Sequence, residues 1–234
     1  MDPARKMMGI ASLNPSYGRD PSQLIMNDKD QQIVAATVGK RVPLNSTIKL
    51  EPYNPAWPRM YETLARQIRE ALGTKALAVE HVGSTSVEGL SAKPIIDVVL
   101  VVPDSADESA YVPPLERVGY VLRIREPDWF EHRMLKSSGV DGNLHVFSRA
   151  CPEIDRVLAL RDWLRVNDDD RRLYERTKQD LAARTWKYVQ DYADAKSEVV
   201  AGILGRALGA GGHQGDRRVA QRPSPRSRGE GQVQ

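Results

Sequence analysis

The chain has 234 residues, of which 41% are hydrophobic and 6% aromatic, so we expect one domain with extensions and a largely aliphatic core. Its single cysteine, Cys151, excludes an internal disulfide, and the absence of a long apolar run or a signal-peptide pattern favours a cytoplasmic protein without a membrane partner. The net charge of +3 does not indicate nucleic-acid binding, because residues 206–234 carry six arginines against Asp216 and Glu230, a net +4, which leaves −1 for the rest.

The two ends of the chain differ in composition from its middle. Residues 1–46 show no sustained hydrophobic period, so we predict a loosely ordered N-terminal extension. Residues 209–234 are rich in Gly, Pro, Ser and Arg, and we predict a basic disordered tail that contacts nucleic acid at most weakly and nonspecifically. The folded domain is therefore expected over residues 47–208.

The domain begins with a short alternating run and an amphipathic helix. Residues 47–50 alternate as a strand does, and Asn54 with Pro55 predicts a helix start. Gly73 ends the helix. Its apolar residues recur at helical spacing: Trp57, Tyr61, Leu64, Ile68 and Leu72.

Two strands follow, joined by a turn that contains glycine and serine. Residues 76–82 are predicted as a strand that enters this turn. Residues 94–102 form an aliphatic run ended by Pro103, which is typical of a central strand covered on both faces. Residues 105–118 are predicted as a helix, although Pro113 and Pro114 must lie near its start or interrupt it.

The rest of the domain changes from strands to helices. Strands are predicted over 119–125, 129–136 and 143–148, and helices over 152–166, 168–184 and 189–208. Strands mixed with helices, followed by helices alone, indicate an α+β fold. We predict a mixed β-sheet backed by helices, with a C-terminal helical part.

One carboxylate stands out on the predicted central strand. Because alternate side chains of a strand share a face, Asp97 points the same way as Val99. The turn at Gly83 and Ser84 precedes Asp97 and offers backbone N–H groups and a hydroxyl, which together could hold a phosphate and its metal. The alternative is a glycine-containing connection into a core strand, with Asp97 capping a neighbouring turn.

Several separated motifs resemble the GrpB family, in the same order and over about residues 48–208. They are YNPAW at 53–57, EHVGSTSV at 80–87, AKPIID at 92–97, EHR at 131–133, LHVF at 144–147, RDWLR at 161–165, and Tyr174 with Lys178. That family is assigned to the nucleotidyltransferase fold of the DNA polymerase beta-like superfamily. The resemblance implies that Gly83, Ser84 and Thr85 face the phosphates of a nucleoside triphosphate and that Asp97 is a catalytic metal ligand.

The chain departs from the enzyme pattern of that superfamily. Enzymes of the superfamily carry two carboxylates two positions apart on one strand and a third on a later strand. Here Val99 follows Asp97 at the second position, and the later strand offers His145. A carboxylate pair at that spacing brackets two metal ions, so this strand cannot supply both ligands. Glu131 is the best remaining carboxylate for a catalytic role.

A different set of ligands remains open. His81, His132 and His145 all lie in the motifs and, with Asp97, would suit a transition metal, whereas Asp97 with nucleotide phosphates would suit a single Mg²⁺. The alternative is that each histidine is hydrogen-bonded without a metal.

Basic residues add a second element of the predicted site. Lys93 lies in the loop before the central strand, and Arg133, Arg161 and Arg165 carry guanidinium groups that suit phosphate. For Arg161 and Arg165, ion pairs with acidic neighbours are an equal alternative.

Three functions therefore remain open on the sequence, of which a partner-binding protein whose basic tail makes the contacts is ranked last. The first is metal-dependent transfer of a nucleotidyl group from a nucleoside triphosphate to an unknown acceptor. The second is a catalytically inactive module that binds a nucleotide or another phosphorylated metabolite. Val99, at the position where the enzymes carry a carboxylate, favours this second function.

Overall fold

The computed structural model describes residues 33–39 and 44–219. Its centre is a five-stranded sheet with the order β1-β2-β5-β4-β3. The pair β2 and β5 is parallel, and the other neighbouring pairs are antiparallel, so the sheet is mixed. The strands are β1 (Ala78–Val82), β2 (Ile96–Val102), β3 (Tyr120–Glu126), β4 (His132–Ser137) and β5 (Gly142–Ser148).

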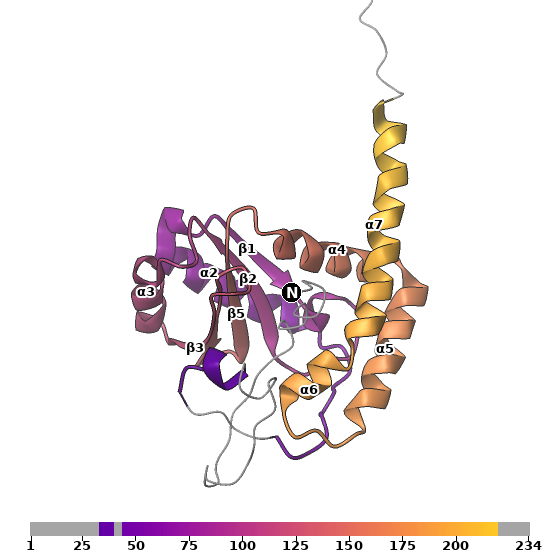
Figure 1. The fold of residues 1–234 in the computed structure, drawn as a ribbon, viewed down its shortest axis with the longest axis horizontal. Helices are drawn as coiled ribbons and strands as arrows, with labels where there is room; N and C mark the ends of the chain where they lie inside the picture. Colours follow the sequence, from indigo (N-terminus) through magenta and orange to yellow (C-terminus); the bar gives the residue numbers. More distant parts are fainter. Residues whose placement is uncertain (1–32, 40–43, 220–234) are drawn as a thin grey trace, which may run out of the picture.

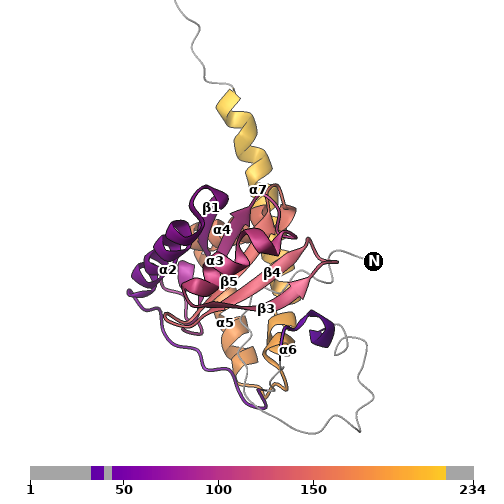
Figure 2. The same cartoon turned by 90° about the vertical axis from the view of Figure 1, so that its left-hand side faces the viewer.

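Helices cover both faces of this sheet (Figures 1 and 2). The helices α2 (Trp57–Leu72) and α3 (Val112–Arg117) lie on one face. The other side of the molecule carries α4 (Pro152–Val166), α5 (Asp168–Ala182), α6 (Val189–Asp194) and α7 (Ser197–Val219). The predicted α+β class, mixed sheet and C-terminal helical part are confirmed.

The larger core lies between the sheet and α2 with α3. Every second residue of β2, from Ile96 to Val102, packs there with Leu144 and Val146 of β5 and with Leu64 and Ile68 of α2. The opposite face of the sheet has a smaller apolar cluster that includes Val99, Val101 and Phe147 and packs against α4. The alternation predicted for the central strand therefore decides which residues enter which core.

Several predicted elements differ from the structure. Residues 47–50 form no named strand, and only isolated bridges join Ser46 to Trp186 and Glu51 to Ala92. The first helix begins at Trp57. Before it, the Asn54 side chain accepts a hydrogen bond from the Ala56 N–H and forms a turn. A proline occupies the first turn of the helix.

Two other helical predictions were too long or too short. The helix predicted over 105–118 is reduced to Val112–Arg117, since two prolines without N–H groups fit only its first turn. The helix predicted over 189–208 is divided into α6 and α7, and α7 continues to Val219, past the predicted start of the disordered tail. Residues 1–32, 40–43 and 220–234 of the predicted extension and tail lie outside the described residues.

Candidate functional site

The turn after β1 brings the backbone against Asp97. Gly83 has φ +69° and ψ −174°, a conformation that is essentially restricted to glycine. A Cβ atom at this position would lie 2.5 Å from Asp97 Oδ2, so only glycine lets the chain pass this close to the carboxylate. A single 3-10 turn, Ser84–Ser86, follows immediately. The motif therefore places a turn and a carboxylate side by side.

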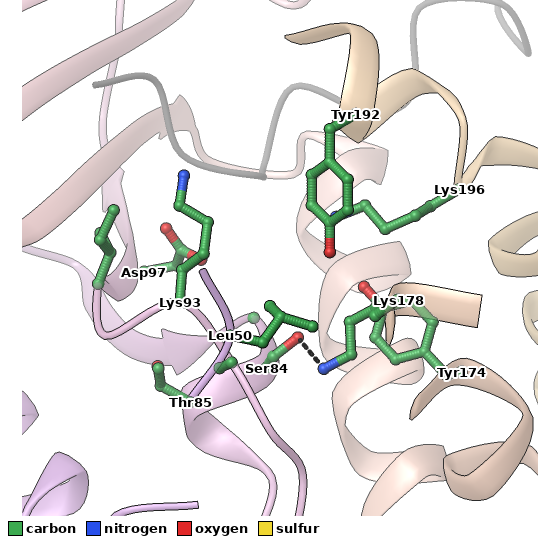
Figure 3. Close-up of a pocket in the computed structure, with 12 residues that line it drawn as sticks. Leu50, Ser84, Thr85, Lys93, Asp97, Tyr174, Lys178, Tyr192 and Lys196 are labelled. Atoms are coloured by element: carbon green, nitrogen blue, oxygen red, sulfur yellow. Dashed lines mark hydrogen bonds between the residues drawn. The ribbon is translucent and has the colours of Figure 1, made fainter. Parts of the chain in front are cut away.

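A cavity opens beside this turn, between the sheet and the C-terminal helices (Figure 3). The sheet side contributes Gly83, Ser84, Thr85, Lys93 and Asp97, all five of which were predicted from the sequence as site residues. The helical side contributes Tyr174, Lys178, Tyr192 and Lys196. The remaining lining residues are Leu50, Ala92 and Ile95.

Two lysines from the helical side are almost fully buried in this wall. Lys178 on α5 is 2% exposed, and its Nζ donates to Ser84 Oγ at 3.3 Å and to the carbonyl oxygen of Ser91. Lys196, between α6 and α7, is 5% exposed, and its Nζ lies 4.4 Å from the centre of the Tyr192 ring. Desolvation lowers the pKa of Lys178 to about 7 and that of Lys196 to about 8.

The cavity has an excess of positive charge. Lys93 is its third ammonium group, and burial lowers the pKa of that group to about 8. Asp97 is the carboxylate that lines the cavity, and burial raises its pKa to about 6 although the Asn143 side chain donates to its Oδ1 at 2.9 Å. Three lysines against one carboxylate make a site that favours an anion. A bound anion would stabilise the protonated form of each lysine, which burial disfavours.

His145 and His132 do not line the cavity but continue from Asp97 along the same face of the sheet. His145 is the cross-strand neighbour of Val99 on the same face of the sheet, and its Nε2 is 4.0 Å from Asp97 Oδ1. Its Nδ1 is 3.1 Å from Nε2 of His132, whose Nδ1 is 2.8 Å from Oε2 of Glu126. Desolvation holds the pKa of His145 well below its usual range. Asp97, His145 and His132 are thus brought together as predicted.

His81 is not part of that group. It pairs with Val98, so its side chain points to the opposite face of the sheet, where its ring stacks on Tyr61 at 4.7 Å and its Nε2 is 3.0 Å from Thr85 Oγ1. Within residues 33–39 and 44–219, no three His, Cys, Asp or Glu side chains are grouped in a way that could hold a metal ion. The predicted set of three histidines around one metal is therefore not formed.

The structure also separates Glu131 and Arg133 from the cavity. Arg133 pairs with Val146, so it lies on the face of α2 and α3, where its Nε donates to Glu108 at 2.6 Å. Glu131 accepts from Arg133 at 3.2 Å. The alternation of β4 therefore places Arg133 away from Asp97, and Glu131, which precedes the strand, is held by Arg133 on that other face.

Arg161 and Arg165 fasten α4 to the sheet. Arg161 donates to Glu80 at 2.8 Å and to the carbonyl oxygen of His81 at 3.0 Å, and it also pairs with Asp162. Arg165 donates twice to the carbonyl oxygen of Ser86. Both guanidinium groups also pair with Asp162, as the ion-pair alternative predicted for them, and neither lines the cavity with Asp97.

The helical wall was missed by the sequence analysis. Tyr174 and Lys178 belong to a motif of the resemblance, yet neither was assigned to the site, and Tyr192 and Lys196 were not considered. The usable signal was the spacing of Tyr174 and Lys178, which places both side chains on one face of α5, the apolar stripe that must pack inward. A lysine on that stripe is rarely buried without a functional or structural partner.

Comparisons with known proteins agree with the motifs. The sequence model of the family described as "GrpB protein" matches residues 47–206. The UPF0157 protein BH1888 of Halalkalibacterium halodurans is 58% identical over 178 residues, which are 76% of this chain and 91% of that protein. The UPF0157 protein SCO7215 of Streptomyces coelicolor is 43% identical over 68% of this chain and 84% of its own length.

A solved structure supports the same assignment. The crystal structure of the conserved protein GrpB from Enterococcus faecalis matches with a TM-score of 0.59 and 29% identity, over 69% of this chain and 98% of that one. Among the helices of the described residues, none has the length and apolar character needed to cross a membrane. The matched region contains the sheet, the turn at Gly83 and both walls of the cavity, and the chain belongs to the GrpB family.

Proposed function

We propose that the cavity binds the phosphate chain of a nucleoside triphosphate or of a similarly phosphorylated metabolite. The observation that carries the proposal is the convergence of Lys93, Lys178 and Lys196 on the turn at Gly83 and Ser84. These lysines come from three separate segments, and two of them are buried at a cost that an anion would offset. The family resemblance, which implies that this turn faces a triphosphate, supports the same assignment.

A single divalent cation fits this site better than a pair of them. Asp97 supplies one carboxylate, while Val99 is apolar and fully buried, so the strand lacks the second ligand of a two-metal centre. A cation held by one carboxylate and by substrate phosphates is a common arrangement for Mg²⁺. Such an ion would neutralise phosphate charge and orient the phosphate chain.

Nucleotidyl transfer is the second candidate function, and the place of Asp97 against the turn favours it. In such a reaction the hydroxyl oxygen of an acceptor forms a bond to the α-phosphorus, the bond from that phosphorus to the bridging oxygen breaks, and pyrophosphate leaves. The hydroxyl proton must go to a base. Glu131 lies on the other face of the sheet with Arg133, so it does not fill this role in the described arrangement.

The two functions separate in one set of measurements. Thermal melting of the full chain with each of the four nucleoside triphosphates and with inorganic tripolyphosphate, in the presence and absence of Mg²⁺, measures binding. We expect stabilisation by the triphosphates and by tripolyphosphate, and loss of the Mg²⁺-dependent part in Asp97→Asn. No stabilisation by any of these compounds would refute the binding proposal.

Pyrophosphate release tests the transfer step. Release that requires Asp97 and an added hydroxyl acceptor would support transfer. Binding that persists without Mg²⁺ and without pyrophosphate release, over a broad set of acceptors, would support the inactive module.

A further inference from the structure

A row of polar side chains crosses the sheet on the face that carries Asp97. It runs from Asp97 on β2 through His145 on β5 and His132 on β4 to Glu126 on β3. Three of the four are buried, with His132 and His145 each 1% exposed. Glu126 lies at the outer end of the row, with 23% of its side chain exposed. This row is called the Glu126–Asp97 row below.

The proton positions in this row follow from Glu126. With Glu126 as the acceptor and both imidazole rings neutral, the two contacts allow one set of proton positions, in which Nδ1 of His132 carries the proton donated to Glu126 Oε2. The Nε2 atom of neutral His132 is then an acceptor, so Nδ1 of His145 donates to it. The second ring nitrogen of His145, Nε2, is left with a free electron pair.

That free electron pair has no partner. His145 Nε2 is buried and makes no hydrogen bond with any described residue. The nearest charged atom recorded for it is Asp97 Oδ1 at 4.0 Å, which also bears electron pairs and is too far for a hydrogen bond. Two buried electron-pair donors that face each other across such a gap are the arrangement that a cation stabilises.

We propose that Asp97 Oδ1 and His145 Nε2 bind one divalent transition-metal ion, of the Mn²⁺ or Zn²⁺ class. Two metal bonds of about 2.0–2.2 Å that meet at a tetrahedral angle of about 109° hold their ligand atoms about 3.3–3.6 Å apart, so the 4.0 Å gap accepts one ion after a contraction of less than an ångström. Imidazole is a ligand that such metals accept and Mg²⁺ disfavours. The inference deepens the proposed function and rests on it only for the phosphate that would complete the coordination.

His132 and Glu126 act as positioning residues for this ion. Metal-binding histidines commonly donate their other ring N–H to a second group, which fixes the tautomer and the ring orientation. Here that second group is His132, which Glu126 fixes in turn. With two protein ligands, the remaining coordination positions stay open to water or phosphate oxygens, in keeping with the lack of a third grouped ligand in the described part of the chain.

Metal titration of the full chain, stripped with a chelator, tests the site. Binding of Mn²⁺ is measured from the electron paramagnetic resonance signal of the free ion, and binding of Zn²⁺ and Mg²⁺ is measured by calorimetry. We expect one Mn²⁺ or Zn²⁺ per chain and binding of Mg²⁺ at least about tenfold weaker. His145→Asn keeps an N–H near the position of Nδ1 and removes Nε2, and it should weaken Mn²⁺ binding at least about tenfold.

His81→Asn is the matched control, because His81 is a buried histidine on the opposite face of the sheet. The His81→Asn variant should bind Mn²⁺ with the same affinity as the unchanged protein. Equal affinity in His145→Asn, or no Mn²⁺ and Zn²⁺ binding by the unchanged protein, would overturn the inference.

The tautomers give a test that needs no variant. Long-range ¹H–¹⁵N correlation spectra of the unchanged, metal-free protein report which ring nitrogens carry protons. We expect His145 to be protonated at Nδ1 and bare at Nε2, with a shift of the Nε2 signal on addition of Zn²⁺. A proton on Nε2, donated towards Asp97, would refute the metal site.

The metal site and the proposed function can fail separately. Binding of tripolyphosphate without binding of Mn²⁺ or Zn²⁺ would refute the metal site alone. Binding of Mn²⁺ or Zn²⁺ without binding of tripolyphosphate or nucleoside triphosphates would refute the proposed function alone.

Discussion

The two faces of the central sheet use the same strands for different purposes. On β2, Ile96, Val98 and Leu100 enter the large apolar core, while Asp97 faces the turn at Gly83 and the lysines of the helical wall. On β5, Leu144 and Val146 join that core, and the residue between them is His145 of the Glu126–Asp97 row. The alternation of a strand therefore lets one face stabilise the fold while the other holds groups that are costly to bury.

The largest expected effect is on the apolar face. Leu100→Ala removes a fully buried side chain from the large core and leaves a cavity. The free energy of unfolding should fall by about 2–5 kcal/mol. Urea denaturation measures this loss, while tripolyphosphate binding by the folded fraction should be retained. A loss of binding in folded Leu100→Ala would contradict the division between the two faces.

Gly83→Ala tests the contact between the turn and Asp97. The backbone strain should cost about 1–3 kcal/mol, and the new Cβ atom would also lie 2.5 Å from Asp97 Oδ2. Gly89→Ala is the matched control, because Gly89 also has a positive φ, +76°, but a Cβ there meets nothing within 4 Å. Urea denaturation and tripolyphosphate titration should show that both variants lose stability and that only Gly83→Ala loses binding. Equal binding in the two variants would show that the close approach is not needed.

The pH dependence of stability tests the buried ammonium group of Lys178. Its pKa is about 7 in the folded protein and 10.5 for the unperturbed group, so between these values the unfolded chain binds more protons. The free energy of unfolding of the unchanged protein should therefore rise from pH 7 to pH 9 by about 2 kcal/mol more than that of Lys178→Met. Urea denaturation of both proteins at the two pH values measures this change. Lys49→Met, at a side chain that is 87% exposed, should show no such shift. A difference independent of pH would mean that Lys178 keeps an ordinary pKa.

Lys196→Met gives the smallest expected effect and separates binding from folding. Met retains much of the buried length without the desolvated charge, so stability should not fall. The affinity for inorganic tripolyphosphate, measured by calorimetry, should fall about tenfold, which is about 1.4 kcal/mol. Unchanged affinity would remove Lys196 from the phosphate site.

Much of the sheet side of the site was predictable because its signals are local. The turn at Gly83, the loop with Lys93 and the start of the strand with Asp97 lie within residues 80–97, and strand alternation fixes which way Asp97 points. The same alternation, applied to residues 129–136, does not tell which of its two faces meets Asp97. For this reason Glu131 and Arg133 were grouped with a site that lies on the other face.

The helical side was not predictable from local signals. Lys178 and Lys196 lie 95 and 113 residues after Gly83, and they reach the cavity because α5 and the connection between α6 and α7 pack against the turn. The spacing of Tyr174 and Lys178 indicates that Lys178 lies on the inward face of α5, but it does not tell which cavity that face meets, and Lys196 has no such local signal.

The sequence by itself determined the α+β class and the local pairing of a glycine turn with Asp97, because periodicity and residue spacing are properties of neighbouring residues, and its motifs carried the resemblance to the GrpB family. Only the tertiary structure decided which charges share the cavity and which histidines belong to the Glu126–Asp97 row. Strand order and helix docking set those distances, and both result from long-range packing that no short stretch of sequence encodes.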